Sequence, residues 1–341
     1  MKASPMSLPE AEKRGGIRAL FRSKLLRAAV SIIILGLLLW KLDLQKVVQI
    51  LRDVDPGLLL LGTALLLVAN MVSIFKWRLI LRAREVSASF FYLTSLFYIG
   101  LFFNNFLLSS MGGDVVKAFK LSRQTGRGVE ATGSVVVDRA SSAFALLAMA
   151  LIAAGFELRL LEPWMSALVV VMFVAAVLLI GLIVSERAAR TLSGLPLLRR
   201  DPMGMRRHAR SLWLSLHSYN QHRGTMAWVM AISLAYQCLT VVTIYVLALS
   251  LGIEVPVIYY FLFIPIVLAV SMLPVSLNGL GVREVAWVAL FSLVNVAEAE
   301  ALSMALLSFI VITVVSLAGG VFYLFDHSVP VPESGEAHGN S

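Results

Sequence analysis

Long apolar runs constrain this chain more than any other feature of its sequence. A helix needs about 20 apolar residues to cross the hydrocarbon of a bilayer. Only 14% of the residues are charged, against about 25% in a typical soluble domain. The apolar runs occupy residues 25–42, 57–75, 90–108, 131–156, 164–184, 226–251, 257–275, 280–296 and 299–325. Because lipid offers the backbone no hydrogen bonds, they predict an all-α, polytopic integral membrane bundle of about eight spans.

The two ends of the chain differ from this apolar middle. Residues 1–24 are polar and basic and predict a mobile cytosolic arm. Residues 326–341 carry acidic residues but no Lys or Arg, and predict a disordered acidic tail. Residues 25–325 lie between them as one membrane domain, with no polar segment large enough for a separate soluble catalytic domain.

Charge and cysteine content argue against several classes of function. The net charge of +9 comes from basic residues that cluster between apolar runs, which favours anionic lipid headgroups over nucleic acid as partners. The single Cys238 excludes an intrachain disulfide, and the five histidines show no metal-ligand spacing. No phosphate-binding loop and no nucleophile–base pair is evident, so we expect no ATP-driven step, no metal ion and no cofactor.

Two polar breaks interrupt the apolar runs, one in each half of the chain. The first, NNFLLSSMGGDVVKAFK, covers residues 104–120, and the second, LPVSLNGLGVREVAW, covers residues 273–287. Irregular backbone at membrane depth is tolerated only where it is buried in protein or lines a wet cavity. A pair of such breaks in corresponding places also marks binding sites in transporters built from internal repeats. The bundle is therefore predicted to contain one or two broken or re-entrant helices.

The distribution of Lys and Arg supports a re-entrant first break. Seven basic residues lie in 1–27, four in 76–84, four in 117–127 and eight in 187–223. These segments fall on one side, the cytoplasmic side with the N-terminus, only if residues 90–108 enter the membrane and return at the break. If residues 280–296 are re-entrant too, the acidic tail is expected on the opposite side.

The first break contains Gly112, Gly113, Asp114 and Lys117. The glycines allow backbone amides to approach a phosphate closely. Asp114 either caps the helix that follows or contacts an amine or hydroxyl group of a lipid headgroup, and the two roles are compatible. Lys117, together with Lys120 and Arg123, predicts a short amphipathic helix whose bases are solvated at the membrane surface.

Three further groups of polar residues are candidates for a site. Asp138 and Arg139 stand near the start of a span, where adjacent residues face apart, so Asp114 is a candidate partner for Arg139; alternatively, Arg139 only extends to the membrane surface. Arg283 is the best candidate for a lipid phosphate, with an ion pair to Asp138 or Glu284 as its alternative. The remaining candidates are Asn105, which could line a cavity or satisfy broken backbone, and Asn278 and Gly281 in the second break. The Trp77–Arg78 pair and Arg82 are predicted to anchor the second span at the interface.

These motifs together resemble the lysylphosphatidylglycerol synthase transmembrane region family, also called the flippase-like membrane domain family. The resemblance rests on NNFLLSSMGGDVVKAFKL, VVVDRASSAFALLA and LPVSLNGLGVREVAWVALF in this order, with support from KWRLILRA, and covers about residues 25–325. The residues that match the family pattern are Gly112, Gly113, Asp114, Lys117, Asp138, Arg139, Gly281, Arg283 and Glu284. Lys117 stands where Arg is commoner, and Leu108 where many members have Pro.

The resemblance implies lipid translocation in the inner membrane, with a phospholipid or lipid-linked glycan headgroup moving through a polar cavity between the two breaks. Because few residues follow the last run, we expect no aminoacyl transfer. The alternatives are a membrane enzyme or accessory subunit that acts on a lipid- or polyprenyl-linked substrate, or a scaffold for a glycosyltransferase. The implied partners are anionic phospholipid or glycolipid cargo and a lipid-modifying enzyme or glycosyltransferase.

Overall fold

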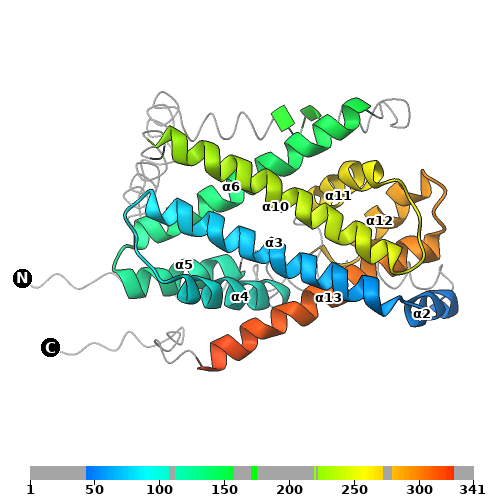
Figure 1. The fold of residues 1–341 in the computed structure, drawn as a ribbon, viewed down its shortest axis with the longest axis horizontal. Helices are drawn as coiled ribbons and strands as arrows, with labels where there is room; N and C mark the ends of the chain where they lie inside the picture. The colour runs from blue at the N-terminus through cyan, green and yellow to red at the C-terminus, as the bar shows by residue number, and fades with distance from the viewer. Residues whose placement is uncertain are drawn as a thin grey trace, which may run out of the picture.

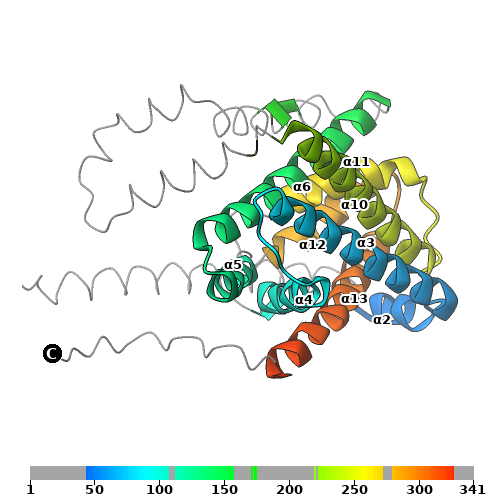
Figure 2. The same ribbon diagram turned by 60° about the vertical axis from the view of Figure 1, so that its left-hand side comes forward.

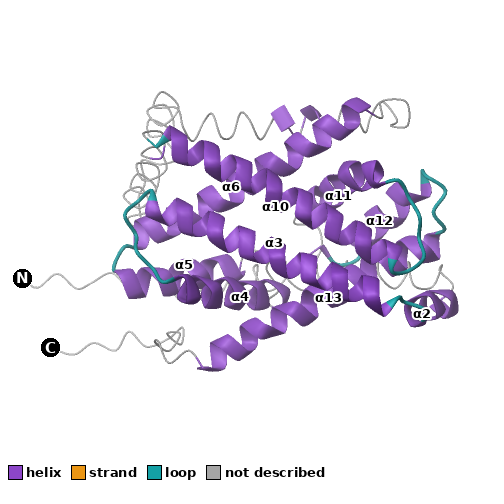
Figure 3. Ribbon diagram, in the orientation of Figure 1, coloured by secondary structure: helices purple, strands orange, loops and turns teal. Residues whose placement is uncertain are grey.

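The computed structural model describes residues 44–106, 112–156, 170–171, 173–174, 219, 222–271 and 279–325. Its regular elements, in the described part of the chain, are all helices, as Figure 3 shows. They are α2 (Leu44–Arg52), α3 (Pro56–Arg82), α4 (Phe90–Phe106), α5 (Gly112–Thr125), α6 (Gly128–Phe156), α10 (Arg223–Leu249), α11 (Val257–Ser271), α12 (Val282–Ser292) and α13 (Glu298–Phe325). The predicted all-α membrane bundle is confirmed. The predicted spans at 25–42 and, apart from four helical residues, at 164–184 lie outside the described residues.

Four of these helices are long and apolar enough to span a bilayer, namely α3, α6, α10 and α13. Each has 27 to 29 residues and is therefore about 40 Å long, more than the roughly 30 Å of hydrocarbon. α3 begins sharply because Pro56 occupies its first turn and Asp55 Oδ1 accepts a hydrogen bond from the Leu58 amide at 2.9 Å. α3 and α10 pack along each other at the centre of the bundle (Figure 1).

The remaining helices between these spans form two short hairpins. α4 and α5, of 17 and 14 residues, pack against each other, and so do α11 and α12, of 15 and 11 residues. At 1.5 Å per residue, α5 and α12 reach only about 21 and 16 Å, which is too short to cross. The predicted half-membrane return at the first break is therefore present. The turns of the hairpins, residues 107–111 and 272–278, lie outside the described residues.

The long helices and the hairpins form two span–hairpin–span units, and the second unit runs through the bundle in the direction opposite to the first. In Figure 1, α3 runs toward the left end of the bundle, α4 and α5 enter and leave from that end, and α6 runs back. α10, the α11–α12 hairpin and α13 follow the same order from the other end (Figures 1 and 2). This arrangement is the inverted repeat that the paired breaks suggested, and it directs both hairpins toward the middle of the bundle.

One expectation about topology is wrong. α13 ends at the same end of the bundle as α3 and α5, where the basic connections lie (Figure 1). The reason is that α11 and α12 act together as one hairpin, so only α13 crosses after α10. Residue 325 therefore lies on the side of the basic connections, and not opposite to them.

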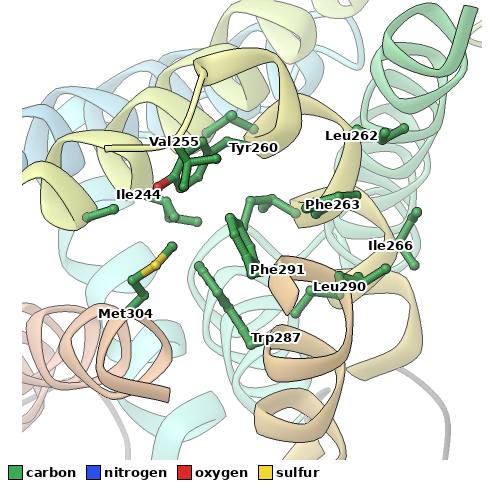
Figure 4. Packing of buried hydrophobic residues seen from close by; sticks show 14 of the residues in the cluster. Ile244, Val255, Tyr260, Leu262, Phe263, Ile266, Trp287, Leu290, Phe291 and Met304 are labelled. Atoms are coloured by element: carbon green, nitrogen blue, oxygen red, sulfur yellow. The ribbon is translucent and has the colours of Figure 1, made fainter. Parts of the chain in front are cut away.

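The interior of the second hairpin is packed with aromatic rings. Trp287 and Phe291 of α12 stack at 5.0 Å between centroids, and Phe291 also contacts Tyr260 and Phe263 of α11 at 5.2 and 5.3 Å (Figure 4). These four rings are nearly inaccessible to solvent. Such contacts hold the two short helices as one unit inside the bundle.

The first hairpin depends on a close approach of backbones at a glycine. A Cβ atom built on Gly113 would lie 1.8 Å from the carbonyl oxygen of Gly100, so only glycine fits at this point. We predict that Gly113→Ala lowers the thermal unfolding temperature strongly, because α5 must move away from α4. Gly155→Ala is the matched control: its Cβ meets nothing within 4 Å, so it should be neutral or slightly stabilising. Equal melting temperatures for the two variants in detergent would contradict the close packing.

Candidate functional site

The start of α5 forms a three-residue charge cluster with α6. Asp114 is paired bidentately with Arg139, at 2.6 Å from Nε to Oδ2 and 3.0 Å from Nη2 to Oδ1. Lys117 Nζ lies 3.0 Å from Asp114 Oδ1 and faces the Trp77 ring at 5.2 Å. The side chains of Asp114 and Lys117 are 10% and 6% exposed, while that of Arg139 is 49% exposed. The cluster carries one net positive charge, and the Arg139 guanidinium is the part of it that is accessible.

Residues of α4 contact the start of α5 and leave room for the side chain of Lys117. The Gly113 amide donates to Asn104 Oδ1 at 2.8 Å, so a side chain of α4 satisfies this amide at the helix start. Gly100 makes room for the Lys117 stem, whose Cγ and Cδ atoms lie 2.7 Å from a Cβ built on Gly100. Gly112 opens the helix. The predicted pairing of Asp114 with Arg139 is found, and the side chain that accepts from the Gly113 amide at the helix start is that of Asn104.

The predicted solvation of α5 is wrong for Lys117 and Lys120, whereas Arg123 is exposed. Lys117 and Lys120 are buried at 5% and 7% exposure, whereas Val115 and Phe119 are exposed at 66% and 36%. Lys120 Nζ lies 5.0 Å from the Tyr323 ring centroid on α13. In the first turns of the helix, the apolar side chains of Val115 and Phe119 therefore face outward, and the two lysines face the protein. This orientation suits lipid surroundings, where charges gain by pointing to the interior of the bundle.

A second ion pair joins α3 to α6 and was not anticipated. Lys76 Nζ lies 2.9 Å from Asp138 Oδ1 and also donates to Ser142 Oγ at 2.5 Å. The Lys76 side chain is 0% exposed and that of Asp138 is 10% exposed. Trp77, the residue after Lys76, was predicted as a surface anchor. It is only 1% exposed, and its indole N–H donates to Ser134 Oγ at 3.0 Å. The signal available in the sequence was the Lys immediately before Trp77, at the end of an apolar run.

The second break supplies a third pair at the start of α12. Arg283 donates to Glu284 Oε1 from Nε at 3.0 Å and from Nη2 at 2.5 Å. Glu284 Oε2 accepts from the Gly281 amide at 2.7 Å, and Gly281 has a φ of 83°, which favours glycine. The alternative in which Arg283 pairs within the chain is therefore the one observed, with Glu284 and not Asp138 as partner. The Arg283 guanidinium also lies 4.7 Å from the Phe309 ring centroid on α13.

Two candidate amides complete the account of the predicted site. Asn105 Nδ2 is buried and has no hydrogen-bond partner among the described residues. Asn278 lies outside the described residues. The predicted residues thus fall into separate groups: Asp114, Lys117 and Arg139 around the first hairpin, Asp138 with Lys76, and Arg283, Glu284 and Gly281 at the second hairpin. No group of three or more metal-ligating side chains occurs in the described ranges.

The chain matches the family model described as "Lysylphosphatidylglycerol synthase TM region" over residues 24–320. No curated protein and no solved structure matches it. The match covers both hairpins, three of the four long helices in full, α13 as far as residue 320, and every charged pair described above. It identifies a membrane protein tied to lipid metabolism or translocation. With most of its length inside this match, the chain belongs to the lysylphosphatidylglycerol synthase TM region family.

Proposed function

We propose that this protein translocates a lipid headgroup between the leaflets of the inner membrane. The observation that carries the proposal is the set of three buried charge groups placed between apolar spans, two of them at the starts of α5 and α12. Ionisable side chains are expensive within a bilayer and concentrate along substrate and ion pathways. A purely structural bundle would be equally stable, or more stable, with apolar residues at these positions.

The geometry supports a division of roles for the headgroup. Arg139 uses Nε and Nη2 for Asp114, and its half-exposed guanidinium keeps further N–H groups for a phosphate. Asp114 then faces an amine or hydroxyl of the same headgroup. Arg283, at 19% exposure, serves as the second phosphate contact from the opposite hairpin. The acyl chains stay in lipid, against the exposed apolar side of α5. The remaining proposed contacts are Asn105, Gly112, Gly113, Lys117, Asp138, Asn278, Gly281 and Glu284.

The sequence suggests no ATP-dependent step, so we propose downhill or ion-coupled movement. Asp114, Asp138 and Glu284 are the carboxylates placed to carry a proton, since each is buried beside a base. We also propose a cytoplasmic N-terminus, which the clustering of Lys and Arg in the connections supports. A lipid-modifying enzyme or glycosyltransferase is the partner that would supply such cargo.

Leaflet exchange in reconstituted vesicles tests this proposal. Vesicles that contain the full chain and fluorescent lipids with anionic, zwitterionic or glycosyl headgroups are treated with a membrane-impermeant quencher. We expect protein-dependent loss of the protected inner-leaflet fluorescence for at least one phosphate-bearing headgroup class. If no class exchanges faster than in protein-free vesicles, the proposal fails. Formation of a covalent lipid product would favour the membrane-enzyme alternative instead.

A further inference from the structure

A cavity lies at the connection between α3 and α4, apart from the charge groups described above. Its volume is about 350 Å³, and its lining is Arg78, Arg82, Val86, Ser87, Ala88, Ser89 and Leu93. Arg78 and Arg82 stand four residues apart in the last turns of α3, so their side chains share one face of the helix. In the described part of the chain, neither arginine forms an ion pair with a carboxylate. The cavity therefore presents two cationic groups together with serine hydroxyls.

The local backbone holds this cavity open. Glu85 has a φ of 56°, and the Val86 amide donates back to the Leu81 carbonyl oxygen at 3.0 Å, which reverses the chain after α3. The Val86 side chain is buried and fixes the connection to the bundle. The chain then enters α4, where the Tyr92 amide donates to Ser89 Oγ at 3.2 Å. The positive end of the α4 dipole thus adds to the charge of the arginines.

An exposed apolar stripe leads along α3 to the cavity. Leu67, Met71 and Phe75 are 42%, 36% and 51% exposed. They precede Arg78 and Arg82 at spacings of three and four residues and lie on the same face of the helix. The stripe from Leu67 to Phe75 is about 12 Å long, which is close to the depth of one hydrocarbon leaflet. An apolar stripe that ends in a cationic cavity matches an amphiphile with an anionic head, and not a soluble anion.

We infer that this cavity is a binding site for the phosphate of an anionic membrane lipid, held at the membrane surface by Arg78 and Arg82 with its acyl chains along α3. The site lies where the chain enters α4, apart from the three charge groups, and its occupancy does not depend on transport. Arginine suits it because its planar guanidinium pairs with phosphate oxygens in a bidentate manner.

A binding titration of the purified full chain in detergent, read by native mass spectrometry, tests the inference. The probe is dioleoyl phosphatidylglycerol, with dioleoyl phosphatidylcholine for comparison. We expect the double variant R78Q/R82Q to bind phosphatidylglycerol about thirtyfold more weakly, from about 1 kcal/mol for each base near the surface. Ala88→Glu, which keeps both arginines but places a carboxylate in the cavity, is expected to cause a similar loss.

The matched control is R123Q/R223Q, which removes two exposed bases without touching the cavity. It should keep wild-type affinity, and an equal loss in this control would overturn the inference in favour of general surface charge. Equal binding of the two lipids by the wild type would overturn it as well. In the second arm, inorganic phosphate is added at the same concentration as the lipid. The lipid should stay bound. Displacement that depends on Arg78 and Arg82 would show a site for the free anion instead.

Discussion

Replacing Asp138 by leucine is expected to destabilise the protein by about 3–5 kcal/mol, because it leaves a fully buried ammonium without its counter-charge. Lys76 is 0% exposed and, among the described residues, would retain as neighbours Ser142 Oγ at 2.5 Å, the backbone oxygen of residue 138 at 3.3 Å and the Tyr236 ring. None of these neutralises a charge. A loss of this size would exceed the effect of most single substitutions.

The double variant K76M/D138L separates the charge from the packing. It removes both ions and keeps similar side-chain volumes, so we expect it to regain most of the lost unfolding free energy. Tryptophan fluorescence during thermal or denaturant unfolding in detergent gives the comparison. A double variant as unstable as Asp138→Leu would show that the loss comes from altered packing between α3 and α6, and would contradict a role for the unpaired charge.

Replacing Asp114 by alanine is expected to abolish leaflet exchange and to destabilise the protein by about 2–3 kcal/mol. The substitution leaves Arg139 and Lys117 as neighbouring like charges with no carboxylate between them. The loss of stability is smaller than for Asp138 because Arg139 is 49% exposed and can be solvated. The loss of leaflet exchange is nevertheless expected to be complete, because Asp114 orients the Arg139 guanidinium that we propose to bind phosphate.

Glu130→Gln is the matched control for Asp114→Ala. Glu130 pairs with Arg127 at 3.2 Å with side chains 22% and 37% exposed, so its loss should change stability by only about 0–1 kcal/mol. Exchange should continue at the wild-type rate. The two variants are compared at equal protein content per vesicle. If Asp114→Ala, correctly folded, exchanged lipid at the wild-type rate, the charge cluster on α5 would be structural only.

The sequence alone predicted the features that depend on composition and on charge distribution. The apolar runs predicted the helical bundle, and the basic connections required a half-membrane return before Gly113, which α4 and α5 provide. The pairing of Asp114 with Arg139 was also anticipated, because adjacent residues of a helix face apart and Arg139 needed a partner elsewhere.

The features that depend on which side of a helix meets the protein were not predictable in this way. An amphipathic pattern is the same whether its polar side faces water or the bundle interior, so Lys117 and Lys120 were assigned to the wrong surroundings. In the sequence, Lys76 was counted among the basic residues of a connection. Its pairing with Asp138 arises from the packing of α3 on α6, which the sequence does not show. The side of the bundle on which α13 ends depended on whether α11 crosses the membrane, which its sequence does not decide.

The most direct test of lipid movement past the first hairpin is the initial rate of anionic-lipid exchange with the triple variant D114L/K117M/R139M. This variant removes the exposed guanidinium, its carboxylate partner and the buried ammonium of Lys117 together, so the fold is expected to remain intact, as verified by its unfolding temperature. If the charge cluster forms part of the lipid path, exchange should fall to the rate of protein-free vesicles. Exchange at the wild-type rate in this folded variant would contradict the account.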